Sequence, residues 1–179
     1  MRFALALLLA AGTATLAAGA MEPLPLGAPA PRITAPDQDG APVDFHAETA
    51  HGATVVYFYP KAGTPGCTAQ ACSLRDADEA LRQRGIRVIG VSLDPIATQH
   101  DFHARNGLNF RLVADPERIV ADSFGVAALP NGRDQRETFL IRDGIVVWRQ
   151  LEAIPETQGT DVVKAYDSLG AKASPPPAS

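Results

Sequence analysis

Both cysteines of the chain, Cys67 and Cys72, lie in one short segment, and a cysteine thiolate is a strong nucleophile. Residues 54–59, just before this segment, are β-branched and aromatic, which is typical of a buried strand. Residues 60–63 are rich in turn formers and end this strand. Cys67 therefore stands just beyond the point where a strand gives way to the next element.

The residues after the turn predict a helix whose first turn contains Cys67. Thr64 is a typical N-cap residue, and Pro65 suits the first helical position because its missing N–H costs nothing there. Unpaired backbone N–H groups and the positive end of the helix dipole favour an anion in this turn, so they stabilise a thiolate relative to the thiol. We therefore interpret Cys67 as a candidate nucleophile.

Cys72 follows Cys67 by five residues, and this spacing constrains any bond between the two. Along an intact α-helix, five residues rise about 7.5 Å and turn about 140°, which puts the Cα atoms roughly 8 to 9 Å apart. A disulfide normally needs less than about 7 Å. If these cysteines bond, the start of the helix must unwind. An apolar stripe at helical spacing predicts that Cys67 faces the core and Cys72 does not; it consists of Cys67, Ala71, Leu74, Ala77 and Leu81.

The whole segment 58–76, FYPKAGTPGCTAQACSLRD, resembles the active-site segment of peroxiredoxins of the bacterioferritin-comigratory or Q type, which carry a second cysteine five residues after the first. Pro60, Thr64 and Cys67 match the family pattern of a proline, a threonine or serine, and the first cysteine. The resemblance spans residues 24–169, with further matching segments at 88–92, 112–117, 124–126 and 136–141.

The resemblance implies an atypical two-cysteine peroxidase that reduces hydrogen peroxide and organic hydroperoxides and uses no bound cofactor. Cys67 would be the peroxidatic cysteine, which attacks the peroxide and becomes a sulfenic acid. Cys72 would be the resolving cysteine, which forms an intramolecular disulfide with Cys67. A thioredoxin-like dithiol protein would then restore both thiols by exchange.

Three further site residues follow from the resemblance. Thr64 matches the residue whose hydroxyl contacts the peroxide oxygens, and Pro60 matches the residue that shields the pocket. Arg136 matches the arginine that the family brings beside the cysteine. A guanidinium in that place stabilises a thiolate and can also donate hydrogen bonds to the peroxide.

Composition is consistent with one domain and excludes some partners. The chain has 179 residues, 46% of them hydrophobic, which is enough for one core and too short for two comfortable domains. The formal net charge is -4, and no cluster of Lys and Arg would follow a phosphate backbone. We therefore expect no nucleic-acid partner. We also expect a monomer, because an intramolecular resolving cysteine needs no second subunit.

The two ends of the chain differ from the predicted domain at residues 21–171. Residues 1–20 read as a cleavable signal peptide, in which Arg2 precedes an apolar stretch that ends in the small residues Ala18-Gly19-Ala20. We expect a periplasmic or secreted protein, cleaved near Ala20, without stable membrane association. Met21 as the true start is the alternative. The tail 172–179, rich in Pro, Ala and Ser, predicts disorder.

Strands alternate with helices along the domain, which favours an α/β fold. Residues 31–45 predict an N-terminal β-hairpin with its turn at 37–40. The further predicted strands are 54–59, 87–92, 110–113, 138–141 and 145–148, and the helices are 65–84, 96–106, 117–124 and 159–169. A tight turn at 142–144 makes the last two strands antiparallel. This order fits a thioredoxin-like mixed sheet flanked by helices, the fold that the resemblance implies.

Several alternatives use the same residues differently. In an oxidising compartment the cysteine pair could form a permanent structural disulfide. An exported copper-delivery protein of the same fold has three residues between its cysteines, against four here, and thiol–disulfide exchange proteins have two. His100 and His103, three residues apart on a predicted helix with Asp101 or Asp94 nearby, could bind a metal, although exposed helix polarity also accounts for them.

Overall fold

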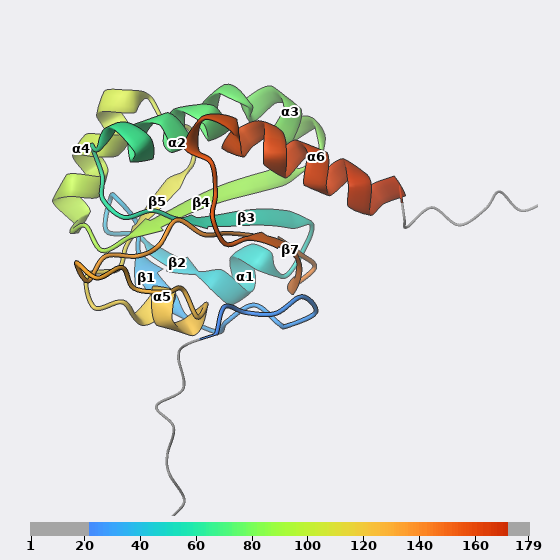
Figure 1. Ribbon diagram of the computed structural model, residues 1–179, viewed down its shortest axis with the longest axis horizontal. Helices are drawn as coiled ribbons and strands as arrows, with labels where there is room; N and C mark the ends of the chain where they lie inside the picture. Colours follow the sequence, from blue (N-terminus) through green and yellow to red (C-terminus); the bar gives the residue numbers. More distant parts are fainter. Residues whose placement is uncertain (1–21, 172–179) are drawn as a thin grey trace, which may run out of the picture.

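One mixed β-sheet forms the centre of the molecule and separates two groups of helices (Figure 1). The computed structural model describes residues 22–171, so the predicted signal segment 1–20 and the predicted disordered tail 172–179 lie outside the described residues. The main sheet has the strand order β5-β4-β3-β6-β7. Its strands are β3 Ala53–Phe58, β4 Ile86–Ser92, β5 Arg111–Ala114, β6 Thr138–Arg142 and β7 Ile145–Gln150.

The pairing of these strands confirms the mixed, thioredoxin-like sheet. β3, β4 and β5 run parallel to one another. β6 lies antiparallel to β3, and β7 lies antiparallel to β6. The predicted turn between β6 and β7 is a two-residue hairpin loop in which Asp143 has φ 49° and Gly144 has φ 78°. Positive φ at both central residues gives this turn the twist that adjacent antiparallel strands need.

Each face of the sheet has its own cover (Figure 1). On one face lie α2 Pro65–Asp76, α3 Asp78–Gln83, α4 Ile96–Asn106 and α6 Gln158–Ala171, the last preceded by the short 3-10 helix η1 Pro155–Thr157. On the other face lie the predicted N-terminal hairpin, β1 Thr34–Pro36 and β2 Pro42–Asp44, and the helices α1 Phe45–Thr49 and α5 Ile119–Ser123. Within residues 22–171, none of the helices combines the length and the apolar character that a membrane crossing requires.

The central strand β3 supplies side chains to both cores, which explains why it reads as continuously apolar. All six of its residues are buried. Successive side chains of a strand point to opposite faces, so Val56 and Phe58 enter the core under α5 while Val55 and Tyr57 enter the core under α2. A strand flanked by partners on both edges and covered on both faces is typical of the middle of an α/β sheet.

The predicted helix 65–84 is wrong as a single element, because it consists of two helices. α2 ends at Asp76, and Ala77 leaves helical geometry with φ -83° and ψ 3° before α3 begins at Asp78. Asp78 and Glu79 stand in the first turn of α3, where the positive end of a helix dipole favours carboxylates. The other predicted strands and helices end within two residues of their predicted bounds, as helix and strand ends commonly do. The exceptions are the hairpin, whose first strand begins at Thr34 and not at residue 31, and the short helix α1, which the sequence did not predict.

Candidate active site

Cys67 lies in the first turn of α2, where the sequence places it, and its side chain faces the core. Pro65 occupies the first position of the helix. The Cys67 side chain is only 1% exposed and packs in the same core cluster as Tyr57, Tyr59 and Leu74. Cys72 is half-buried, and both cysteines are free thiols. The predicted difference in environment between the two thiols is therefore confirmed.

Thr64 stands at the N-cap but does not cap the helix with its side chain. Its backbone is extended, with φ -78° and ψ 151°, as an N-cap residue requires, yet no backbone N–H donates to its hydroxyl. Instead, Thr64 Oγ1 donates a hydrogen bond to the carbonyl oxygen of Lys61 at 3.0 Å. This bond uses the hydroxyl proton and leaves the oxygen lone pairs available to accept from a ligand. The expected side-chain cap is thus wrong, because the tight turn offers the hydroxyl a nearer partner.

Arg136 reaches Cys67 although 69 residues separate them in the chain. Its Nη2 donates to Cys67 Sγ at 3.4 Å, and its Nη1 donates to Gln70 Oε1 at 2.5 Å. The backbone oxygen of Arg136 accepts from the N–H of Ala153 at 3.1 Å. Gln70 therefore fixes the guanidinium and Ala153 fixes the backbone of Arg136. A positive charge beside the sulfur stabilises a thiolate.

The register between β3 and β6 explains how Arg136 arrives at this place. Tyr57 pairs with Thr138, and the N–H of Phe58 donates to the oxygen of Glu137 at 2.7 Å. Because the two strands are antiparallel, the residue before Glu137 lies just beyond the carboxyl end of β3. The loop to α2 starts at the same end, so Arg136 and Cys67 meet above it.

Gly66 leaves the space that the Arg136 guanidinium occupies. A Cβ atom at Gly66 would lie 3.3 Å from Arg136 Nη2 and 3.8 Å from the Pro155 ring. A Cβ here would therefore be a tight contact, and the guanidinium would have to shift by a few tenths of an ångström to accept it. The absence of one is part of how the site is built.

The loop around Pro60 is held by hydrogen bonds to residues at and just after the end of β4 and to the segment before β6. The N–H of Ala62 donates to the buried carboxylate of Asp94 at 2.7 Å, and Ser92 Oγ donates to the same oxygen at 2.9 Å. The carbonyl oxygen of Pro60 accepts from Arg133 Nη1 at 3.2 Å. These contacts fix the loop that carries Pro60 and Thr64 toward Cys67.

The tyrosines beneath the site stay neutral. Tyr57 is fully buried, and burial raises the pKa of its hydroxyl well above the ordinary value. Burial also raises the pKa of Tyr59, although hydrogen bonds with Ser92 and Gln99 oppose the shift. Neutral hydroxyls do not compete with a thiolate for the positive charge of Arg136. Among the described residues, the Tyr57 hydroxyl has no hydrogen-bond partner.

The structure thus brings Arg136 into contact with Cys67 at the start of α2. Thr64 is the N-cap of the same helix, and Pro60 lies in the loop that leads to it. Cys72 lies in the same unbroken helix, on a different side of it from Cys67. Five residues of intact helix hold two Cα atoms too far apart for a disulfide, so the two thiols meet only if α2 opens.

Sequence reasoning missed Gln70 and Gln158, which extend the site inward. Gln70 bonds both Arg136 and Gln158, whose Oε1 accepts from Gln70 Nε2 at 2.9 Å. The signal for Gln70 is its position three residues after Cys67, on the adjacent side of a helix. Gln158 carries no such signal, because only the packing of α6 on α2 brings it near.

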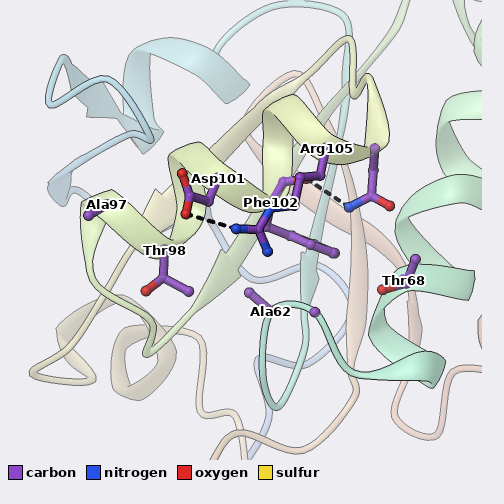
Figure 2. A pocket seen from close by; sticks show the side chains of 9 residues that line it. Ala62, Thr68, Ala97, Thr98, Asp101, Phe102 and Arg105 are labelled. Atoms are coloured by element: carbon purple, nitrogen blue, oxygen red, sulfur yellow. Dashed lines mark hydrogen bonds and ion pairs between the residues drawn. The ribbon is translucent and has the colours of Figure 1, made fainter.

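A pocket of about 380 Å³ lies between α4 on one side and the start of α2 with the loop at Ala62 on the other (Figure 2). Thr68 lines it from α2, while Asp101 and Arg105 of α4 form an ion pair at 3.2 Å across its wall. Neither Cys67 nor Arg136 lines this pocket. It is therefore an open space beside the first turns of α2, separate from the face where the thiol meets the guanidinium.

The candidate metal ligands do not converge. Among residues 22–171, no group of three or more His, Cys, Asp or Glu side chains is arranged to hold a metal ion. The exposed His100 has Asp39 as its acidic neighbour, with Nε2 3.9 Å from a carboxylate oxygen. Asp94, considered beside the histidines, instead holds the loop at Ala62.

Comparisons with known proteins agree with this geometry. The AhpC/TSA family model matches residues 26–149. Peroxiredoxin Bcp of Escherichia coli (strain K12) is 44% identical over 109 residues, which are 59% of this chain and 67% of that protein. The chloroplastic peroxiredoxin Q of Oryza sativa subsp. japonica is 38% identical over 148 residues, which are 80% of this chain and 67% of that protein.

A solved structure extends the comparison to the fold. The structure of the Xanthomonas campestris bacterioferritin comigratory protein, which concerns alkyl peroxide reduction activity, matches with a TM-score of 0.72 at 25% sequence identity. The match covers 82% of this chain and 97% of that chain. This chain therefore belongs to the AhpC/TSA family, is similar to the Bcp and Q peroxiredoxins, and is a peroxidase.

Proposed function

We propose that the chain reduces hydrogen peroxide and organic hydroperoxides with Cys67 as the peroxidatic cysteine and Cys72 as the resolving cysteine. The observation that carries the proposal is the contact between Arg136 Nη2 and Cys67 Sγ, at 3.4 Å, in the first turn of α2. Burial disfavours a thiolate relative to the neutral thiol unless a positive charge or hydrogen-bond donors stabilise the anion. Arg136 and the start of α2 supply both kinds of stabilisation.

In the first step, the Cys67 thiolate attacks the terminal oxygen of the peroxide. An S–O bond forms as the O–O bond breaks, so sulfur loses two electrons and becomes a sulfenic acid. The leaving alkoxide or hydroxide takes up a proton and departs as an alcohol or water. Arg136 stabilises the negative charge that moves from sulfur to the leaving oxygen. The Thr64 hydroxyl oxygen accepts from the O–H of the peroxide, and Pro60 shields the pocket from water.

In the second step, α2 opens and the Cys72 thiol condenses with the sulfenic acid. The S–S bond forms, and the sulfenic oxygen leaves as water with the thiol proton. A thioredoxin-like dithiol protein then reduces the disulfide by exchange, and its own dithiol becomes oxidised. The relative from Xanthomonas campestris supports organic hydroperoxides as substrates, since its structure concerns alkyl peroxide reduction.

We further propose that the protein works as a monomer after export and cleavage near Ala20. The intramolecular cysteine pair requires no second subunit. The signal-like residues 1–20 support export, and the reductant would have to act in the same compartment.

The test is anaerobic addition of one equivalent of peroxide to the reduced protein, followed by thiol counting and peptide mapping. The wild type should lose two thiols and yield a peptide that links Cys67 to Cys72. Cys67→Ser should consume no peroxide, and retention of more than a few per cent of the wild-type rate rejects the assignment.

Cys72→Ser should still reduce one equivalent and then stop, because its sulfenic acid has no partner. Dimedone should label Cys67 in this variant. A variant that continues to cycle with a dithiol protein, or that shows no adduct on Cys67, would contradict the role of Cys72.

A further inference from the structure

A line of hydrogen-bonded glutamines leads from Arg136 into the interior of the protein. Arg136 Nη1 donates to Gln70 Oε1 at 2.5 Å, and Gln70 Nε2 donates to Gln158 Oε1 at 2.9 Å. Gln158 Nε2 then donates to Gln150 Oε1 at 3.1 Å. Gln70 and Gln158 are both 0% exposed. We call Gln70, Gln158 and Gln150 the glutamine chain.

The charge of Arg136 orients every amide in the glutamine chain. A guanidinium only donates, so Gln70 must present its oxygen to Arg136 and its nitrogen to Gln158. The same argument turns Gln158 toward Gln150, whose Nε2 lies 3.4 Å from a carboxylate oxygen of Asp161. The amide dipoles therefore align from a cation at one end to an anion at the other, and such aligned bonds strengthen one another in a low-dielectric interior.

Gln158 is the residue of the glutamine chain whose side chain is held by hydrogen bonds to several elements. It begins α6, and its Oε1 also accepts from the Thr138 hydroxyl of β6 at 2.9 Å. Its Oε1 and Nε2 thus bond three different elements, namely α2, β6 and β7. Among the described residues, the Gln70 side chain has no comparable anchor other than Gln158, because its other hydrogen bond is with Arg136 itself.

We propose that Gln158 is a positioning residue of the peroxidase reaction. It fixes Gln70, and Gln70 fixes Arg136 Nη1 so that Nη2 faces Cys67 Sγ. Gln158 touches neither the thiol nor the peroxide and acts only through these two residues. The inference rests on the proposed function, because it assigns Arg136 to the attack of Cys67 on the peroxide.

The position of Gln70 between the two cysteines gives Gln158 an opposite effect on the second step. Opening the turn that separates Cys67 from Cys72 displaces Gln70 and therefore breaks its bonds to Gln158 and Arg136. A neighbouring contact acts in the same way, because Ser73 Oγ donates to the oxygen of Glu156 at 3.0 Å and accepts from the N–H of Gly159 at 3.1 Å.

The α4 side of α2 is less tightly packed at its first turns. The pocket beside Thr68 leaves space between the first turns of α2 and α4 (Figure 2). The glutamine chain therefore helps to hold the first turns of α2 folded from the α6 side, and it favours the step that needs Arg136 over the step that needs the helix to open.

The variant Gln158→Met tests this proposal, because methionine keeps the length of the side chain but donates and accepts no comparable hydrogen bonds. Rapid-quench mass spectrometry measures sulfenic acid formation and disulfide formation separately. Gln158→Met should slow the first step about tenfold, as expected for the loss of a hydrogen bond that supports a charged group. It should speed the second step by several fold, because α2 opens more easily.

Val162→Ala is the matched control. Val162 lies one turn further along α6, is fully buried and packs in the core under α2, but carries no hydrogen-bonding side chain. It should lower the melting temperature while both rate constants stay near the wild-type values. Equal changes in Val162→Ala and Gln158→Met would show that Gln158 acts through stability alone and would overturn the proposal.

Two outcomes separate this proposal from the proposed function. If the wild type reduces peroxide and Gln158→Met leaves both rate constants unchanged, only the positioning role fails. If the wild type forms no Cys67 sulfenic acid, the proposed function fails first.

Should Gln158→Met not fold, Gln150→Met removes the outer link at a half-buried residue and should shift both rate constants in the same directions by a smaller factor. Unchanged rates in Gln150→Met would then overturn the proposal.

Discussion

At the scale of single residues, the proposed chemistry depends on a buried sulfur that lies beside a guanidinium. Cys67 is almost fully buried, so water contributes little to the stability of its thiolate. Arg136 donates to the sulfur with one nitrogen and to Gln70 with another. A hydrogen bond to a charged group contributes about 1.5 to 3 kcal/mol, which corresponds to a rate effect of about ten- to a hundredfold.

Arg136→Ala should therefore slow peroxide reduction by about ten- to a hundredfold. It should also slow the alkylation of Cys67 by iodoacetamide at neutral pH, because the thiolate loses its cation. Arg105→Ala is the control, since Arg105 is an exposed residue of α4 that pairs with Asp101. Alkylation at the wild-type rate in Arg136→Ala would remove Arg136 from the site.

At the scale of elements, the crossing of α6 over α2 decides how firmly the site is held. Gly159 makes this crossing close, because a Cβ atom there would lie 2.3 Å from the oxygen of Ser73 and 2.6 Å from the Cβ of Ala77. Ser73 lies in the last turn of α2, and Ala77 is the residue at which the predicted long helix breaks into two. The same contact brings Gln158 to Gln70, so the glutamine chain depends on it.

Gly159→Ala should destabilise the protein by about 1 to 3 kcal/mol, the usual cost of overpacking, and should also slow sulfenic acid formation. Gly170→Ala is the control on the same helix, because no atom of the described residues outside the neighbouring backbone of that helix lies within 4 Å of a Cβ there. The control should be neutral or slightly stabilising, since alanine favours a helix over glycine. Urea unfolding of both variants measures the difference. Equal stability of the two variants would contradict the close crossing.

At the scale of the whole molecule, a buried carboxylate couples stability to pH. Asp134 is 0% exposed and bonds Arg118, and its Oδ2 has no partner among the described residues. Burial raises the pKa of Asp134 to about 7, although the charge of Arg118 opposes the shift. The carboxylates of Asp115, Asp122 and Glu137 raise the pKa further.

The folded protein therefore holds a proton on Asp134 that the unfolded chain releases at its ordinary pKa of 3.8. Stability from this group is fully present below pH 4, falls as the pH rises toward 7, and is constant above it. The loss amounts to a few kcal/mol at most, because one pKa unit corresponds to about 1.4 kcal/mol.

Urea unfolding at pH 5 and pH 8 should show a less stable wild type at pH 8. Asp134→Asn should show a smaller difference, because its amide does not ionise. Some slope should remain, since burial also raises the pKa of Glu137 and of Asp115. An equal slope in wild type and Asp134→Asn would refute the buried proton.

Much of the fold followed from local pattern. The five strands of the main sheet lie within one or two residues of their predicted positions, and the N-terminal hairpin lies inside its predicted range, because the period of apolar residues and the turn formers mark them directly. The break at Ala77 escaped prediction, since both halves of 65–84 carry a helical pattern and only the acidic residues at 78 and 79 mark a new start.

The sequence by itself determined the local features of the site. It placed Cys67 in the first turn of a helix, on the core side, with Cys72 directed elsewhere, because these features depend only on residues within one or two helical turns. Arg136 required the family resemblance, since no local pattern distinguishes it from the other arginines.

Only the tertiary structure decided which distant groups surround the sulfur. The antiparallel register of β6 on β3 brings Arg136 to the start of α2, and the close crossing at Gly159 brings Gln158 to Gln70. The direction of the Thr64 hydroxyl was decided in the same way, by the path of the turn at Lys61. Such contacts join residues through the packing of whole elements, and the spacing along the chain carries no record of that packing.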